Sequence, residues 1–179
     1  MAIPPRLGNA PPRKSGGKFA RIGESWHNGV TTWGESLMTI ARIVAGRDQQ
    51  IIHCSPQETV REAAQRLADK RIGALPVLDR GRVAGIFSER DLLYCVAKHG
   101  DGALGLAIGD VMTAPAITVG PETSVNEALE LMTRRRIRHL PVLDGGNLVG
   151  FVSIGDMVKY RIDLVEHEAE AMREYIRSA

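Results

Sequence analysis

The pattern of apolar and polar residues along this chain of 179 residues occurs twice in the same order. VREAAQRLADKR at 60–71 and VNEALELMTRRR at 125–136 place apolar residues at helical spacing, so each predicts an amphipathic helix. ALPVLD at 74–79 and HLPVLD at 139–144 are short, apolar and rich in branched side chains, and each runs into a turn that contains glycine. These two runs are predicted to be strands.

Each copy also carries a leading strand, a second strand and a closing helix. Ser55 followed by Pro56, with Glu58 three residues after the serine, predicts that the first amphipathic helix begins at a capping box, and Pro121 is expected to begin the second. The remaining predicted elements are the leading strands QQIIHC (49–54) and APAITV (114–119), the second strands VAGIFS (83–88) and LVGFVS (148–153), and the closing helices ERDLLYCVAK (89–98) and IGDMVKYRI (154–162).

A shift of 65 positions superimposes the two copies. KRIGALPVLDRGRVAGIFSERD at 70–91 then lies over RRIRHLPVLDGGNLVGFVSIGD at 135–156, and SPQETVREA at 55–63 lies over GPETSVNEA at 120–128. A helix and a three-stranded sheet of this size cannot bury both faces alone. We therefore expect an α/β (α+β) fold in which two β-α-β-β-α repeats pack face to face around a pseudo-twofold axis.

The expected boundaries are a flexible N-terminal segment (1–35), repeat 1 (36–104), repeat 2 (105–162) and a C-terminal helix (163–179). The first segment is rich in proline, glycine and basic residues, which favours a mobile tail over the alternative of an organellar transit peptide. Residues 33–46 are predicted to be a helix that leads into repeat 1.

The C-terminal helix carries an apolar stripe with the spacing 3, 4, 3, 4. Two alternatives stay open: the stripe caps the second repeat, or it forms a short seam with another subunit. Its members are Ile162, Val165, Ala169, Met172 and Ile176.

Composition narrows the function classes. A net charge of +2 is too small to indicate a nucleic-acid or membrane partner, and 4% aromatic residues weigh against a surface that stacks bases. Two cysteines, Cys54 and Cys95, do not make a disulfide framework, and no apolar run is long enough for a membrane span. We expect a cytoplasmic protein.

The sequence gives little support for a metal site or for enzymatic activity. His53 with Cys54, and Cys95 with His99, do not resemble a zinc arrangement, and both cysteines are expected to be small buried apolar residues. No serine has a histidine and carboxylate placed to activate it, and no phosphate-binding loop of an enzyme is present. We expect no metal site and no enzymatic activity.

The repeated motif is GIFSERD at 85–91 and GFVSIGD at 150–156. Serine at a strand-to-helix junction with aspartate three residues later is typical of a capped helix start. The same arrangement also exposes backbone N–H groups to a phosphate and places a carboxylate where it can accept hydrogen bonds from a ribose diol. The motif therefore has a structural and a nucleotide-binding interpretation.

LPVLD, a turn and GxxSxxD, repeated in tandem, resemble a pair of CBS (cystathionine β-synthase) domains, the arrangement called a Bateman module, of the stand-alone bacterial type. The resemblance covers residues 38–162. It implies that adenosine ligands bind in clefts between the repeats: AMP, ADP or ATP, and in some members NAD(H) or S-adenosylmethionine. It also implies a homodimer and a regulatory, non-catalytic role toward another protein.

By this resemblance, Asp91 and Asp156 are expected to hold ribose hydroxyls, with Ser88 and Ser153 near the phosphates. This assignment favours the nucleotide-binding interpretation of the motif. Two alternatives remain: a dimerisation scaffold without ligand, and a nucleic-acid-binding protein that uses TRRRIRH at 133–139.

The two clefts are expected to differ. In the gamma subunit of AMP-activated kinase, which this chain resembles around the strand, the two residues before Leu-Pro are basic; here they are Arg138 and His139 in repeat 2 but Gly73 and Ala74 in repeat 1. One cleft should therefore hold a highly charged phosphate better. The other is expected to draw its basic group from elsewhere, with Arg90 as the candidate.

Overall fold

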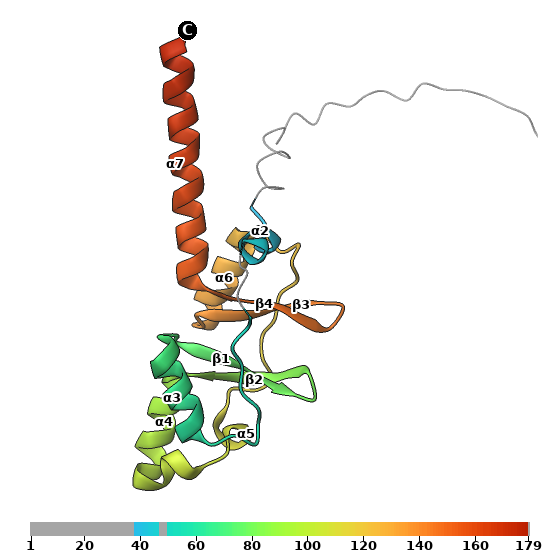
Figure 1. The fold of residues 1–179 in the computed structure, drawn as a ribbon, viewed down its shortest axis with the longest axis vertical. Helices are drawn as coiled ribbons and strands as arrows, with labels where there is room; N and C mark the ends of the chain where they lie inside the picture. The colour runs from blue at the N-terminus through green and yellow to red at the C-terminus, as the bar shows by residue number, and fades with distance from the viewer. Residues whose placement is uncertain (1–37, 47–49, 179) are drawn as a thin grey trace, which may run out of the picture. The chain divides into compact units, whose positions relative to one another are not determined.

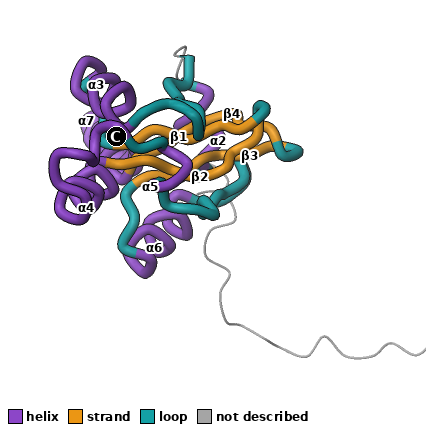
Figure 2. The backbone as a smooth tube through the Cα atoms, turned by 90° about the horizontal axis from the view of Figure 1, so that it is seen from below, coloured by secondary structure: helices purple, strands orange, loops and turns teal. Residues whose placement is uncertain are grey.

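Each repeat builds one antiparallel hairpin. The computed structural model describes residues 38–46 and 50–178, all of which belong to one compact unit. β1 (Ala74–Asp79) pairs with β2 (Arg82–Ser88), and β3 (His139–Asp144) pairs with β4 (Asn147–Ser153), each with an irregularity after the central valine. The strands of the two hairpins lie together between the helices (Figures 1 and 2), with contacts between β2 and β4. This is the α+β fold expected from the repeat.

Helices alternate with the hairpins in both repeats. In chain order they are α2 (Ile40–Ala45), α3 (Val60–Lys70), α4 (Glu89–His99), the 3-10 helix η1 (Gly100–Gly105), α5 (Ile108–Val111), α6 (Val125–Arg135) and α7 (Ile154–Ser178). The expected helix at 33–46 is described only from residue 38 on, where α2 forms; the expected tail lies outside the described residues. The expected closing helix of repeat 2 and the expected C-terminal helix form one continuous helix, α7. The helix is not interrupted at the expected boundary between residues 162 and 163.

The two leading strands are reduced to single bridges, contrary to expectation. Cys54 pairs in parallel with Val77: its N–H donates to the Pro76 carbonyl at 3.2 Å, and its carbonyl accepts from Leu78 at 2.8 Å. A longer parallel ladder would need the next donor on each strand, and those donors would be the nitrogens of Pro76 and Pro56. Neither carries a hydrogen, so pairing stops after one residue.

Repeat 2 reproduces this restriction. Val119 bridges Val142 in parallel, with hydrogen bonds of 3.1 and 2.9 Å to the residues on either side of Val142. The prolines at the equivalent positions are Pro141 and Pro121. The prolines that interrupt the ladder are therefore part of the duplicated unit.

The amphipathic helices begin later than predicted. The first starts at Val60 with a capping box between Thr59 and Glu62, and the second starts at Val125 with a box between Ser124 and Glu127. Ser55 does donate its N–H to Glu58, at 2.8 Å, but these residues form a turn.

The physical reason lies in the carbonyls of that turn. Pro56 and Glu58 accept hydrogen bonds from Gly109 and Ile108 of α5, at 2.9 and 2.8 Å. Carbonyls used by another segment in this way are not available for the i to i+4 bonds of a helix. The helix can begin only at the next residue with a capping side chain, Thr59.

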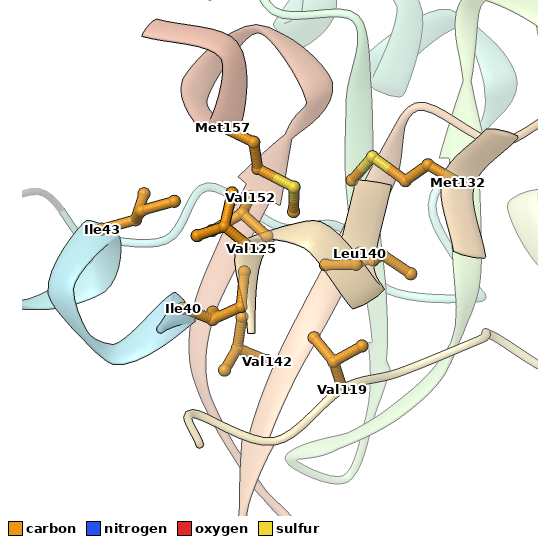
Figure 3. Packing of buried hydrophobic residues seen from close by; sticks show 10 residues of the cluster. Ile40, Ile43, Val119, Val125, Met132, Leu140, Val142, Val152 and Met157 are labelled. Carbon is orange, nitrogen blue, oxygen red and sulfur yellow. The ribbon is translucent and has the colours of Figure 1, made fainter. Parts of the chain in front are cut away.

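The short helices exchange partners between the repeats. α2 precedes repeat 1 but packs into the core of repeat 2 through Ile40 and Ile43, as Figure 3 shows. α5, which precedes repeat 2, packs into the core of repeat 1 through Ile108. The expected boundaries at 36–104 and 105–162 follow sequence order, and sequence order does not reveal this exchange.

Two glycines mark where the exchanged segments cross the hairpins. A Cβ at Gly85 would lie 2.7 Å from Sδ of Met112 and 2.8 Å from the Thr113 carbonyl oxygen. A Cβ at Gly150, its equivalent 65 positions on, would lie 2.6 Å from Cγ2 of Val44. A side chain at either position would push the crossing segment away from the strand.

We predict that Gly85→Ala lowers the free energy of unfolding by about 1–3 kcal/mol, because the backbone oxygen of Thr113 cannot move as a side chain would. Gly102→Ala is the control, since no atom lies within 4 Å of its added Cβ. Denaturant unfolding measures both variants. Equal stability of the two would contradict the close packing at Gly85.

Candidate functional site

Two cavities lie at the N-terminal ends of α7 and α4. The larger, the Asp156 cleft, has a volume of about 700 Å³, and the smaller, the Asp91 cleft, about 130 Å³. The Asp156 cleft is lined by Val44, Gly46, Gln50, Ile51, Ile52, Arg71, Ile72, Gly73, Ala74, His139, Val149, Gly150, Phe151, Val152, Ser153 and Asp156. The Asp91 cleft is lined by Gly73, Ile86, Ser88, Glu89, Arg90, Asp91, Thr113, Ile137, Arg138 and His139. Each cleft thus takes its Ser–Asp motif from one repeat and part of its wall from the other.

The Ser–Asp motif forms a capping box at the start of each closing helix. In the Asp156 cleft, the Ser153 N–H and hydroxyl both donate to Oδ2 of Asp156 at 2.7 Å, and the Asp156 N–H donates to Oγ of Ser153 at 3.2 Å. Both side chains are half-buried. The box holds the carboxylate beside the N-terminus of α7, where the positive end of the helix dipole favours negative charge.

The Asp91 cleft has the same box, and the Thr113 hydroxyl contacts its carboxylate. The N–H of Ser88 donates to Oδ2 of Asp91 at 2.8 Å, while Oδ1 accepts from the Thr113 hydroxyl at 2.7 Å. Thr113 also pairs with Ile86 by two backbone hydrogen bonds of 2.9 and 3.0 Å. Sequence reasoning missed Thr113 because it lies outside the repeated motif, just after α5.

The hairpins fix where the helix starts lie. Ser88 pairs with Ala74 across the first hairpin, and the N–H of Glu89 donates to the Gly73 carbonyl at 3.1 Å. Repeat 2 has the same link, from Ile154 to the Arg138 carbonyl, at 2.9 Å. The positions before Leu-Pro are therefore fastened to the helix N-terminus of their own repeat.

Among the described residues, the Asp91 cleft contains two arginines and the Asp156 cleft contains one. Arg90 and Arg138 both line the Asp91 cleft. Arg90 donates from Nη1 to the Arg136 carbonyl at 2.8 Å, which links α4 of repeat 1 to the end of α6 in repeat 2. The residue equivalent to Arg90 in the second motif is Gly155, so the Asp156 cleft has no such link.

Arg90 does not line the cleft for which it was expected to supply charge. It lines the cleft that also contains Arg138, and among the described residues the arginine that lines the Asp156 cleft is Arg71. Arg71 follows α3 in a left-handed conformation, with φ of 53°, and sequence reasoning did not select it. The sequence feature that could have indicated Arg71 is its position at the end of the predicted helix, two residues before Gly73.

His139 lines both clefts. Its ring stacks on Phe151, with centroids 5.5 Å apart and an interplanar angle of 8°. Burial lowers the pKa of His139 from its ordinary value, although Asp156 and Glu89 act in the opposite direction. His139 is therefore mainly neutral near pH 7, and Arg138 is the permanent cation of the expected basic pair.

Part of the apolar wall of the Asp156 cleft comes from residues outside the motif. Ile51 and Ile52 precede the Cys54 bridge and Ile72 precedes β1, while Phe151 belongs to the motif and lies within β4. The apolar character of Ile51 and Ile52 was visible in the sequence, but it predicted a strand rather than the wall of a cavity.

The cysteines and metal candidates give no second site among the residues that the structure describes. Cys54 and Cys95 are free and buried, as expected, and burial raises the pKa of Cys54 to about 11. No group of three or more His, Cys, Asp or Glu side chains within 38–46 and 50–178 is placed to hold a metal ion. Over the same residues, no helix combines the length and apolarity that a membrane crossing requires.

Comparison with known proteins identifies the class. The model of the CBS domain matches residues 47–98 and 108–163, so the chain belongs to the CBS domain family. It is 36% identical over 135 residues to the CBS domain-containing protein CBSX3, mitochondrial, of Arabidopsis thaliana; this region is 73% of the chain and 66% of that relative.

Solved structures of proteins with CBS domains have a similar fold. A putative signal-transduction protein with CBS domains from Burkholderia ambifaria has a TM-score of 0.66 and 39% identity, over 70% of this chain and 94% of that one. The structure of CBSX2 in complex with AMP has a TM-score of 0.61 and 28% identity, over 70% of this chain and 97% of that one.

We predict that the lowered pKa of His139 makes acid destabilise the fold. The unfolded chain takes up a proton below about pH 6.5, the ordinary histidine pKa, more readily than the folded chain does, so this contribution to the free energy of unfolding falls as pH drops through that range. His139→Gln should lose less stability than the wild type between pH 7 and 5, in urea unfolding at each pH. The exposed His99→Gln is the control, and parallel curves for all three proteins would contradict the prediction.

Proposed function

We propose that this chain is a non-catalytic sensor that binds an adenosine ligand in its clefts and passes the signal to another protein. The observation that carries the proposal is the pair of Ser–Asp boxes, each placed at a cavity lined by both repeats. The AMP complex of CBSX2 supports the ligand class. AMP, ADP and ATP are the first candidates, with NAD(H) and S-adenosylmethionine as further ones.

The groups in the Asp156 cleft suit the parts of an adenosine. Ile52, Ile72 and Phe151 supply apolar surface for a base, and Asp156 has the chemistry to accept hydrogen bonds from a ribose diol. Ser153 and the N-terminal N–H groups of α7 suit a phosphate. A cavity of about 700 Å³ also falls within the usual range for small-molecule sites.

The Asp91 cleft needs a change before it can hold a ligand of that size. At about 130 Å³ it is below the usual range. Arg90 occupies one side of it through its bond to the neutral Arg136 carbonyl. A phosphate would bind that guanidinium more strongly than a carbonyl does, because both partners would be charged. We therefore assign the more anionic ligand to the Asp91 cleft, with Arg138 and Arg90 as its phosphate-binding residues.

The two clefts share Gly73 and His139 as wall. A Cβ at Gly73 would lie 3.3 Å from Cε1 of His139, so the two residues are already close. A ligand that shifts the His139 ring in one cleft changes the shape of the other. This shared wall supports a sensor in which one ligand alters the affinity for the second.

The rest of the proposal follows the family. The partner is a second copy of the chain together with a regulated protein, and two free buried cysteines suit the reducing cytoplasm. A nucleic-acid-binding role is less well supported, because the basic run at 133–139 is divided. Arg134 and Arg135 form the last turn of α6, whereas Arg138 lines a cleft.

We predict that Asp156→Ala weakens binding of AMP by about 10- to 100-fold in calorimetry, because two hydrogen bonds to a charged acceptor are lost. Glu62→Ala is a matched control: Glu62 closes the same kind of capping box at the start of α3 but lines neither cleft. The control should cost about 1 kcal/mol of stability and leave the affinity unchanged.

The ligand panel for this experiment comprises AMP, ADP, ATP, NAD, NADH and S-adenosylmethionine. Absence of binding by all six would leave the boxes as helix caps and favour the dimerisation scaffold.

In the Asp156→Ala background, only the Asp91 cleft remains to be measured. There we predict that Arg138→Ala weakens the binding of ATP by about 10-fold and the binding of adenosine by less than twofold, because only the phosphates would face the guanidinium. Arg134→Ala, on the exposed end of α6, controls for overall charge. Two identical and independent sites in the wild type would contradict the unequal clefts.

A further inference from the structure

The second half of α7 presents an apolar stripe to solvent. α7 runs from Ile154 to Ser178, but Met157 is its one fully buried residue in the described structure. Figure 1 shows the helix extending beyond α6 and the β3–β4 hairpin. The exposed side chains include Ile162 at 52%, Val165 at 60% and Ile176 at 69%. The stripe therefore does not cap the second repeat, which was one of the two alternatives.

The stripe is longer than the sequence first indicated and follows a heptad repeat. It begins at Val158, which is 46% exposed, and alternates steps of four and three residues up to Ile176. In heptad notation the a positions are Ile162, Ala169 and Ile176, and the d positions are Val158, Val165 and Met172. A heptad seam of this kind is what two helices bury when they form a coiled coil.

The charges beside the seam distinguish between the two directions in which a second helix could lie. The g positions hold Arg161 and Glu168, and the e positions that follow five residues later hold Glu166 and Arg173. In a parallel coiled coil each g residue meets the e residue five positions on in the partner. Both contacts, Arg161 with Glu166 and Glu168 with Arg173, then join opposite charges.

An antiparallel pair would join like charges. The register that matches all six apolar layers brings e positions together and g positions together. Glu166 then meets Glu166 of the partner subunit, Glu168 meets Glu168 of the partner subunit, and Lys159 meets Arg173 of the partner subunit. Within the described part of the chain, these four side chains and Arg161 form no salt bridge, so all five are available to a partner.

We propose that a second copy of this chain binds along Val158–Ile176 of α7 as a parallel coiled coil, with Arg161 of each copy paired to Glu166 of the partner subunit. The seam spans 19 residues, about 27 Å of helix. Three heptads are short for an isolated coiled coil, so the folded repeats at its base take part by holding both helices in one direction. The inference does not depend on nucleotide binding.

The test uses charge exchange in the full chain, measured by sedimentation equilibrium. Arg161→Glu and Glu166→Arg should each weaken self-association by about 30-fold, because attraction becomes repulsion at two symmetric contacts. The double variant Arg161→Glu/Glu166→Arg should regain wild-type association. An equimolar mixture of the two single variants should form heterodimers, since both cross-pairs are again opposite in charge.

The direction of the helices is tested by Met172→Cys in a Cys54→Ser/Cys95→Ser background. A parallel seam places the two new thiols together, so oxidation should join the copies by a disulfide; an antiparallel seam separates them. The proposal would be overturned if the charge reversals left self-association unchanged, or if the Met172→Cys variant dimerised without forming this disulfide. Circular dichroism of each variant shows whether α7 remains helical, which separates loss of pairing from loss of the helix.

Discussion

The start of a helix directly at the end of a strand is the constraint on which both clefts depend. Ser88 and Ser153 end their strands and cap the next helices, with the aspartate three residues on closing each box. The same chemistry occurs at Thr59 and Ser124, where glutamate takes the place of aspartate and the box lines neither of the two clefts. Capping therefore does not by itself make a site. What makes it one is a hairpin that carries the capped helix start to the wall of the other repeat.

Prolines contribute to the apolar wall of the Asp156 cleft. Pro76 and Pro56 leave room for one bridge between the leading segment and β1, so the residues before Cys54 are not drawn into a sheet. Ile51 and Ile52 lie in that unpaired stretch and line the Asp156 cleft. The feature that made the leading-strand prediction fail is thus the feature that leaves apolar side chains available to a ligand.

Sequence reasoning succeeded where the signal was local. The hairpins, the closing helices and the Ser–Asp motif are set by strand composition, glycine turns and capping side chains, which act within a few residues. The exchange of α2 and α5 could not be predicted, because the apolar character of a residue such as Ile40 does not show which of two similar cores it joins. The position of Arg90 was also beyond reach, since its partner, the Arg136 carbonyl, lies in the other repeat.

The differences between the two clefts come from a few substitutions within one duplicated frame. Gly73 in repeat 1 corresponds to Arg138, and Gly155 in repeat 2 corresponds to Arg90. Arg90 belongs to the motif of repeat 1, and Arg138 belongs to the wall that repeat 2 contributes to the same cleft. The Asp91 cleft therefore contains both arginines and has the smaller volume, while the Asp156 cleft has the larger one. Duplication alone would have produced two equal sites. Since burial also keeps His139 mainly neutral in the shared wall, the difference between the clefts in the number of cations rests on the arginines and persists across the physiological pH range.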